Sequence, residues 1–135
     1  MILRTLALHR LGRAAARVGP PKTAPYPAPY GAYAPNVVAN PSYRAKYRLS
    51  LWIRPNVQAE GATVTVYLSE VGGKAPGANT AERTVTLRRG WQFVALAGRV
   101  RARKRAFLSI SIRQMANIFP SDAFYIDGVK LQLAG

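Results

Sequence analysis

The sequence predicts an all-β protein, an antiparallel β-sandwich, and three observations support this prediction. Short segments that alternate apolar and polar residues follow one another beyond residue 45. Turn-forming residues separate these segments, and the same part of the chain shows no helical period. Hydrophobic residues make up 49% of the 135 residues, which is enough apolar side chain to build one packed core.

The alternation locates the strands individually. We expect them over residues 46–54, 62–69, 82–88, 91–97, 106–113, 123–126 and 129–133. In the first segment one face carries Tyr47, Leu49, Leu51 and Ile53, which leaves Trp52 on the opposite face. Residues 71–80 contain three glycines and one proline and are expected to form a loop. Trp91 follows the Arg89-Gly90 turn and begins an apolar strand, so we expect it in the core.

The composition is strongly basic and excludes several classes of site. There are 20 Lys and Arg residues against 5 Asp and Glu residues, a formal charge of +15, and no Cys. With one histidine, His9, a histidine metal cluster cannot form and a Ser-His-Asp triad is not expected. No phosphate-binding glycine loop or nucleophile elbow occurs. No apolar run approaches the roughly 18 residues of a membrane span. We therefore expect neither enzymatic activity, nor a cofactor, nor a membrane partner.

Residues 1–41 are expected to form a basic, extended N-terminal arm. All five acidic residues lie beyond residue 59, and the first 59 residues carry nine cations. Residues 1–19 are rich in Arg, Leu and Ala and permit a short helix. Residues 19–41 hold seven prolines and three tyrosines, which predicts an extended segment that either lies on another subunit or is a solvated linker. The residues proposed for anchoring are Arg4, Arg10, Arg13, Arg17, Tyr26, Tyr30 and Tyr33.

A second basic cluster lies between two predicted strands, and its members are Arg99, Arg101, Arg103, Lys104 and Arg105. Such a charge density fits an acidic protein surface or a nucleic acid. The sequence contains no nucleic-acid-binding motif, and its aromatic residues do not interleave with the cluster as stacking platforms do. We therefore expect docking on an acidic protein assembly, with nucleic acid as the less favoured partner.

Three motifs in order resemble the jelly-roll carbohydrate-binding modules of families 4 and 9, in the galactose-binding-like group. They are YRLSLWIRP from residue 47, RGWQFVAL from residue 89 and AFYIDGVKLQL from residue 123, preceded by NPSY from residue 40. The resemblance covers residues 36–135 and implies a jelly-roll fold for residues 42–135. Tyr43 and Tyr47 are only four positions apart in the chain, where the family has several strands. The sandwich is therefore expected to be shortened, with its open edge covered by the arm or by another subunit.

The resemblance also bears on ligands. Related modules often hold a structural calcium ion with an acidic residue after the opening motif; here Arg44 stands at that place, so we expect no calcium site. Sugar binding needs exposed aromatic platforms beside polar groups. The candidates for such a glycan site are Trp52, Tyr67 and Arg113, each of which also has an ordinary packing or surface role open to it.

These observations lead to a prediction of function with one alternative. Such sandwiches also serve as structural modules on tailed-bacteriophage virions, and the arm and one-sided charge favour that role. We predict a non-enzymatic virion structural protein, located in the virion, which decorates the capsid or belongs to the tail. Its expected partners are major capsid or tail subunits and further copies of itself. The alternative is a carbohydrate-binding module that recognises glycans on a face of the sandwich.

Overall fold

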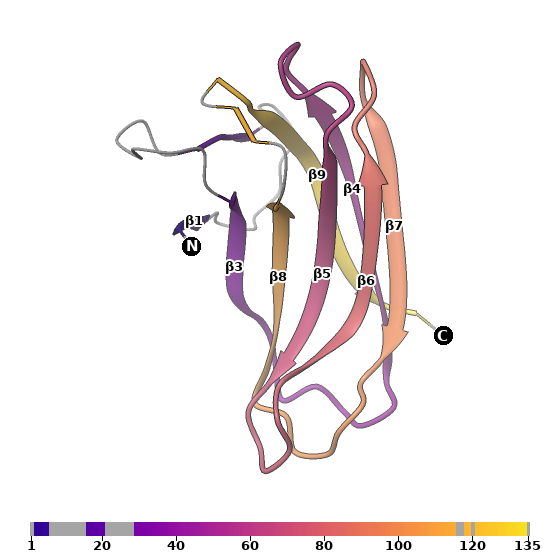
Figure 1. Ribbon diagram of the computed structural model, residues 1–135. Coiled ribbons are helices and arrows are strands. Elements are labelled where there is room, and N and C mark those ends of the chain that lie inside the picture. The colour runs from indigo at the N-terminus through magenta and orange to yellow at the C-terminus, as the bar shows by residue number, and fades with distance from the viewer. Residues whose placement is uncertain (1, 6–15, 21–28, 116–117, 120, 135) are drawn as a thin grey trace.

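The chain forms a β-sandwich of two sheets packed face to face (Figure 1). The computed structural model describes residues 2–5, 16–20, 29–115, 118–119 and 121–134. The strands within these ranges are β1 (Ile2–Thr5), β2 (Ala16–Val18), β3 (Tyr30–Ala39), β4 (Lys46–Pro55), β5 (Thr63–Val71), β6 (Ala78–Thr86), β7 (Gln92–Arg99), β8 (Phe107–Gln114) and β9 (Phe124–Leu133). This architecture confirms the predicted all-β sandwich. Within the described ranges, no helix is long and apolar enough to cross a membrane.

Five strands form one sheet and four form the other. The five-stranded sheet has the order β1-β3-β8-β5-β6, and the four-stranded sheet has the order β2-β9-β4-β7. All pairings are antiparallel except that of β1 with β3, which is parallel. Strands β6 and β7 lie side by side where the two sheets meet (Figure 1).

The core lies between the sheets and consists of the inward side chains that the alternation identified. Leu49, Leu51 and Ile53 of β4 are fully buried, as are Val64, Val66 and Leu68 of β5. The other buried apolar strand residues include Leu108, Ile110 and Ile112 of β8, Val94 and Leu96 of β7, and Phe124 and Ile126 of β9. Removing this apolar surface from water is the main driving force for folding.

The sandwich does not begin at residue 42, because residues 30–39 form β3 between β1 and β8. Inward residues of β3 are small or aromatic, and Tyr30, Ala32 and Ala34 are all buried. The register shifts between Ala34 and Val38, so that Pro35 lies at an irregularity where a missing N–H is tolerated. The predicted boundary between arm and sandwich is therefore wrong. The open edge was expected to be covered either by the arm or by another subunit. The structure supports the first alternative, because the chain's own N-terminal segment lies there.

Tyr30 is an internal residue and is not available to anchor the chain on a neighbour. Its hydroxyl donates a hydrogen bond of 2.6 Å to Oε1 of Gln114, and its ring stacks on Phe124 with centroids 5.5 Å apart. Nε2 of Gln114 donates in turn to Oδ2 of Asp122 at 3.0 Å. Burial raises the pKa of the Tyr30 phenol, and the nearby charge of Asp122 raises it further, while Arg17 opposes this shift.

The remaining arm residues give a mixed outcome. Residues 2–5 and 16–18 are strands, so these parts of the segment 1–19 are not the short helix that the composition permits. Arg4 lies in β1 and Arg17 in β2, where Arg17 pairs in register with Tyr125. Arg10, Arg13 and Tyr26 lie outside the described residues. Val18 of β2 is fully buried, which ties this strand to the core.

Two strands differ in extent from their predicted bounds. Strand β6 begins at Ala78, inside the segment expected to be a loop, because Thr80 turns inward to a buried partner. The last two predicted strands are one continuous strand, β9. Its pairing with β4 shifts register between Ser50 and Trp52, where Gly128 adopts a φ of 59°. A glycine at this irregularity lets the strand continue where the sequence suggested a break.

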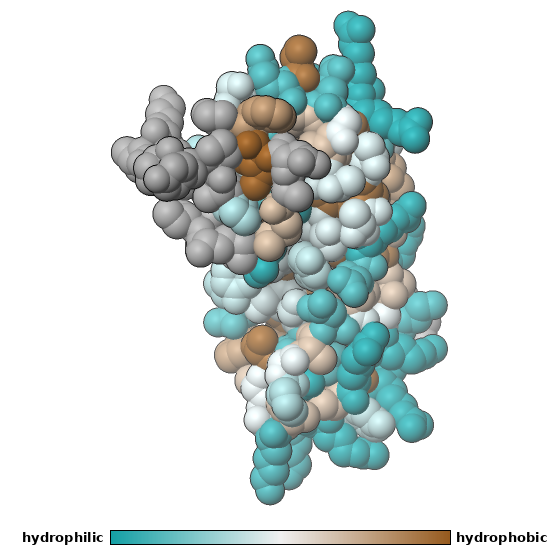
Figure 2. Space-filling model, in the orientation of Figure 1, coloured by the Kyte–Doolittle hydropathy of each residue, from teal (hydrophilic) through white to brown (hydrophobic). Residues whose placement is uncertain are grey.

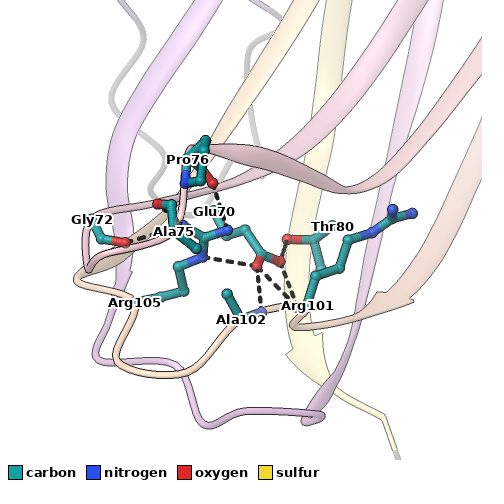
Figure 3. Close-up of polar contacts among 8 residues, drawn as sticks. All are labelled: Glu70, Gly72, Ala75, Pro76, Thr80, Arg101, Ala102 and Arg105. Atoms are coloured by element: carbon teal, nitrogen blue, oxygen red, sulfur yellow. Dashed lines mark hydrogen bonds and ion pairs between the residues drawn. The ribbon is translucent and has the colours of Figure 1, made fainter.

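A buried ion pair ties two loops together at one end of the sandwich (Figure 3). Nε of Arg105 lies 2.9 Å from Oε1 of Glu70, and both side chains are almost completely buried. The guanidinium also donates to the carbonyl oxygens of Gly72, Ala75 and Pro76 at 2.9–3.1 Å. Arg105 was predicted as part of the surface basic cluster. That assignment is wrong, because Glu70 and three carbonyl groups hold its side chain inside.

The Glu70 carboxylate has further donors. The backbone N–H groups of Arg101 and Ala102 and the hydroxyl of Thr80 donate to it at 2.7–3.0 Å. Burial by itself would raise the pKa of Glu70, but the hydrogen bonds from Thr80, Arg101, Arg105 and Ala102 outweigh that effect and lower it. Glu70 therefore stays ionised at neutral pH.

We expect Glu70→Gln to lower the free energy of unfolding by about 3–5 kcal/mol at pH 7, because the substitution leaves Arg105 buried without a counter-charge. Since the native pKa lies below the ordinary value of 4.5, this contribution is present above pH 4.5 and is lost as the pH falls through the native pKa. Chemical unfolding followed by circular dichroism between pH 2 and 7 measures both effects. The exposed Glu60→Gln is the control, and an equal pH dependence of the wild type and Glu70→Gln would contradict the expectation.

We expect Gly31→Ala to lower the free energy of unfolding by about 1–3 kcal/mol, because the added Cβ would overlap the carbonyl oxygen of Ile112 in β8. Gly77→Ala is the matched control, since its Cβ would make only an ordinary contact, 3.5 Å from the carbonyl oxygen of Glu70. Chemical unfolding compares the two variants. If Gly31→Ala were as stable as wild type, β3 would not be an integral strand of the sandwich.

Candidate functional site

The outer face of the five-stranded sheet carries a patch of aromatic and polar side chains in the middle of β3, β8, β5 and β6. Tyr33, Ser111, Tyr67 and Glu82 stand in register across these four strands. We call these residues, together with Arg113, Thr65, Thr84, Ser69, Ser109 and Asn79 from the neighbouring rows, the tyrosine face. Figure 2 views this side of the molecule, where hydrophilic and intermediate residues cover much of the middle of β8, β5 and β6.

Tyr33 and Tyr67 lie on either side of the central strand β8 of this face. Both side chains are half-buried, and the residue between them, Ser111, is small and buried. Neighbouring strands are about 4.8 Å apart, so the two tyrosines come from strands separated by about 10 Å. The rings of Tyr33 and Tyr67 therefore project on either side of Ser111 and leave a shallow polar depression between them.

Arg113 completes one side of this arrangement. Its guanidinium carbon lies 5.6 Å from the centroid of the Tyr67 ring, which fixes the side chain over that ring. Nε of Arg113 is buried and has no hydrogen-bond partner among the described residues. A buried donor without a partner costs about 1–3 kcal/mol.

Further hydroxyl and amide groups lie in the rows on either side of the tyrosines. The hydroxyls of Thr65 and Thr84 are 2.8 Å apart, and the Ser69 hydroxyl donates to Oδ1 of Asn79 at 3.1 Å. Ser109 accepts a hydrogen bond from the backbone N–H of Asn36 at 3.3 Å. The face thus offers fixed polar groups beside aromatic rings, the combination that orients small polar ligands.

The structure separates the three residues predicted for sugar binding. Tyr67 and Arg113 lie together on the tyrosine face, whereas Trp52 lies on the outer face of the other sheet. The prediction that they share one site is therefore wrong. Trp52 and Tyr67 point outward from different sheets, so the whole thickness of the sandwich lies between them. Tyr33 was assigned to the arm. Ala32 and Ala34, which flank it, are buried, but they are too small to mark an inward row in the sequence.

The outer face of the four-stranded sheet carries its own cluster of rings. Trp52 and Phe93 pair across β4 and β7, with ring centroids 5.1 Å apart and planes tilted by 59°. Arg54 lies between Trp91 and Tyr125, with its guanidinium carbon 5.1 Å and 5.0 Å from the two ring centroids. We call these five residues the aromatic–arginine patch. The expectation that Trp91 belongs to the core is wrong, because Trp91 precedes β7 and its ring lies outside against Arg54.

Four residues of the predicted basic cluster, Arg99, Arg101, Arg103 and Lys104, are exposed at the end of β7 and in the loop that follows it. Arg103 and Arg44 both lie over the ring of Tyr43, with guanidinium carbons 4.4 Å and 5.2 Å from its centroid. One aromatic residue thus accompanies the cluster, contrary to the sequence reading. Nε of Arg105 instead turns inward to Glu70, so that four cations remain for a partner.

Metal ligation has no basis in the residues that the structure describes. No group of three or more His, Cys, Asp or Glu side chains among them could hold a metal ion. Asp127, the acidic residue of the C-terminal motif, accepts a hydrogen bond of 2.7 Å from the N–H of Gly128.

Comparison with known proteins places the fold among carbohydrate-binding modules. No protein-family model and no curated protein sequence matches the chain. Among solved structures, it is similar to the N-terminal cellulose-binding domain of β-1,4-glucanase C from Cellulomonas fimi, with a TM-score of 0.61 and 17% identity over 91% of this chain and 80% of that one. It is also similar to a family 4 carbohydrate-binding module, with a TM-score of 0.55 and 16% identity over 76% of this chain and 72% of that one.

These similarities define the class of fold: a jelly-roll β-sandwich like that of carbohydrate-binding modules. Residues 42–135 account for 94 of the 135 residues, about 70%, yet the match to the cellulose-binding domain covers 91% of the chain. The shared fold therefore includes part of the N-terminal segment, in agreement with the place of β3 inside the sheet. The similar cellulose-binding domain is part of a β-1,4-glucanase.

Proposed function

We propose that this protein is a non-catalytic glycan-binding module whose tyrosine face binds an uncharged saccharide. The observation that carries the proposal is the juxtaposition of Tyr33, Tyr67 and Arg113 over the small residue Ser111. The faces of a pyranose ring carry C–H groups that pack on aromatic rings, whereas its edges carry hydroxyls that need hydrogen-bond partners. The tyrosine face supplies both kinds of contact.

Arg113 has a defined role in this proposal. Its guanidinium lies over the Tyr67 ring, and its terminal N–H groups would donate to a sugar hydroxyl above that ring. The paired hydroxyls of Thr65 and Thr84 and the pair of Ser69 and Asn79 lie on the same face and would orient the remaining hydroxyls. The similarity to modules described as carbohydrate- and cellulose-binding supports this class of ligand.

We expect Tyr67→Ala to weaken saccharide binding about 10-fold or more, because it removes a stacking surface and the ring that positions Arg113. Isothermal titration with cellohexaose, xylohexaose and mixed-linkage β-glucan oligosaccharides in 150 mM NaCl identifies a ligand. Affinity for that ligand is then compared between the wild type and Tyr67→Ala. Tyr43→Ala is the matched control, since Tyr43 is also a half-buried tyrosine with an arginine over its ring.

The control should bind as the wild type does. The proposal fails if no neutral saccharide binds the wild type, or if both tyrosine variants bind with unchanged affinity. Arg113→Lys provides a second test, because it keeps the charge and removes the planar guanidinium with its fixed donors. We expect it to weaken binding of the same saccharide, whereas a purely electrostatic role would leave the affinity unchanged.

The role as a virion structural protein stays a prediction, as do its virion location and its capsid, tail and self-association partners. Its original basis was an arm free to lie on neighbouring subunits. Residues 30–39 of that arm pair with β8 of their own sandwich, which leaves this part engaged within the chain. The four exposed cations of the basic cluster are the surface on which an acidic assembly would dock.

A further inference from the structure

We propose that the aromatic–arginine patch is a second binding site, specific for a carboxylate-bearing saccharide such as a uronic-acid oligomer. It lies on the outer face of the four-stranded sheet, on the opposite side of the sandwich from the tyrosine face. The two proposals are independent, because they rest on different residues and on ligands of different charge.

Arg54 is the centre of this second site. It stands in register with Tyr125 of β9, and its guanidinium carbon lies within 5.1 Å of the centroids of both Tyr125 and Trp91. Contacts with two rings restrict a side chain that otherwise has many rotamers, and so lower the entropy lost on binding. The rings thus hold the guanidinium in place before any ligand arrives.

The N–H groups of Arg54 are free to bind an anion. Within the described part of the chain, no carboxylate and no carbonyl accepts a hydrogen bond from the Arg54 guanidinium, and the one salt bridge joins Arg105 to Glu70. A guanidinium presents its donors in a planar fork that matches the two oxygens of a carboxylate. A fixed and unpaired arginine on a surface is therefore suited to a carboxylate group.

The rings beside Arg54 supply the apolar part of the site. Trp52 is 44% exposed, Trp91 40% and Phe93 49%, although all three are large apolar side chains. Exposed apolar residues grouped on one face of a soluble domain mark a binding surface more often than isolated ones do. The row of Trp52 and Phe93 follows the row of Tyr125 and Arg54 along the sheet, so a sugar ring could stack there while its carboxylate pairs with Arg54.

A surface hollow of about 420 Å³ adjoins the patch and gives the ligand a second cation. Its lining includes Arg54 and Tyr125 of the patch together with Arg89, Asn56 and Glu60. This volume falls within the range of about 300–1,000 Å³ that is typical of small-molecule sites. Glu60 is exposed at this hollow and would repel an anionic ligand. Removing its charge should therefore raise the affinity, whereas removing the charge of Arg54 should lower it.

The charges around the patch also orient the ligand. Asp127 stands in register with Trp52, whereas Arg54 stands in register with the uncharged Tyr125. A carboxylate would therefore lie toward Arg54 and away from Asp127, and the neutral part of the sugar toward Trp52 and Phe93. An acidic peptide fits less well, because peptides commonly add to a free sheet edge, whereas Arg54 lies on β4, which has β7 on one side and β9 on the other.

The test uses trigalacturonate as the probe, titrated into the full chain in 150 mM NaCl. We expect Arg54→Gln to weaken binding about 10- to 100-fold, in line with the loss of a charge-assisted hydrogen bond. Arg48→Gln is the matched control: Arg48 is an exposed arginine on the same strand and face, and its substitution removes the same charge. We expect less than a 2-fold change for this control. Glu60→Gln should tighten binding several-fold.

Two further variants separate this site from the tyrosine face and from misfolding. Trp52→Ala should weaken binding of trigalacturonate, whereas Tyr67→Ala should leave it unchanged. Each variant must keep the wild-type thermal unfolding midpoint within a few degrees, because all five substituted residues have exposed or half-buried side chains. If Arg54→Gln weakens the neutral saccharide and not trigalacturonate, the assignment of ligands to faces is overturned.

Other outcomes also overturn the proposal. Equal losses for Arg48→Gln and Arg54→Gln would mean that net charge alone attracts the ligand. A triglutamate peptide that binds more tightly than trigalacturonate, with the same loss on Arg54→Gln, would assign the patch to an acidic protein partner. No binding of trigalacturonate to the wild type at millimolar concentration would remove the second site and leave the proposal for the tyrosine face untouched.

Discussion

The Glu70 carboxylate holds together the end of the sandwich where the β5–β6 and β7–β8 loops meet. It is one of only five acidic residues in a chain with 20 basic ones, and it is fully buried. Arg105, two backbone N–H groups and Thr80 surround it, and Arg105 in turn fixes three carbonyl groups of the loop after β5. Because Arg105 is used internally, its neighbours Arg101, Arg103 and Lys104 are displayed outward on a fixed loop. A single buried pair thus determines which cations of the basic run are available to a partner.

The strands with strict alternation were the part of the fold that the sequence made predictable. In β4, β5 and β8 the apolar residues fall at every second position, and those residues form the core. Strand β3 was missed because Pro35 and the small residues Ala32 and Ala34 obscure the same period. The proline is accommodated by the irregular register between Ala34 and Val38, a tertiary feature that composition does not reveal.

The candidate sites were less predictable, for a geometric reason. Alternation identifies which residues point outward from a strand, but a sandwich has two outer faces, and the pattern does not assign a strand to one sheet or the other. Trp52 and Tyr67 were both predicted at outward positions and do point outward, yet they lie on opposite sides of the molecule. The inward turn of Arg105 is likewise set by Glu70, 35 residues away in the chain, and a run of five cations gives no sign of which one has a buried partner.

The two proposed sites have different physical requirements, and their positions follow from that difference. An uncharged saccharide gains most from rings and hydroxyls, and the tyrosine face has these with Arg113 fixed over a ring. A carboxylated saccharide needs a cation that is held in place but not neutralised, and the rings on both sides of Arg54 provide that without an acidic partner. Both faces are built on strands with fully buried inward residues, which keeps the rings in fixed positions.

Back-to-back sites also constrain how such a protein would act on a polysaccharide. The two sheets pack about 10 Å apart, so the two outer faces point in opposite directions and cannot contact the same sugar residue. Both faces can therefore be occupied at once only by two polysaccharide chains, or by one polysaccharide chain that is long and flexible enough to pass around an edge of the sandwich. In the first case the protein links neighbouring chains, and its apparent affinity for a polysaccharide network exceeds the affinity of either face for a short oligosaccharide. A loss of either face would then reduce retention on the network far more than it reduces binding to oligosaccharides of the other class.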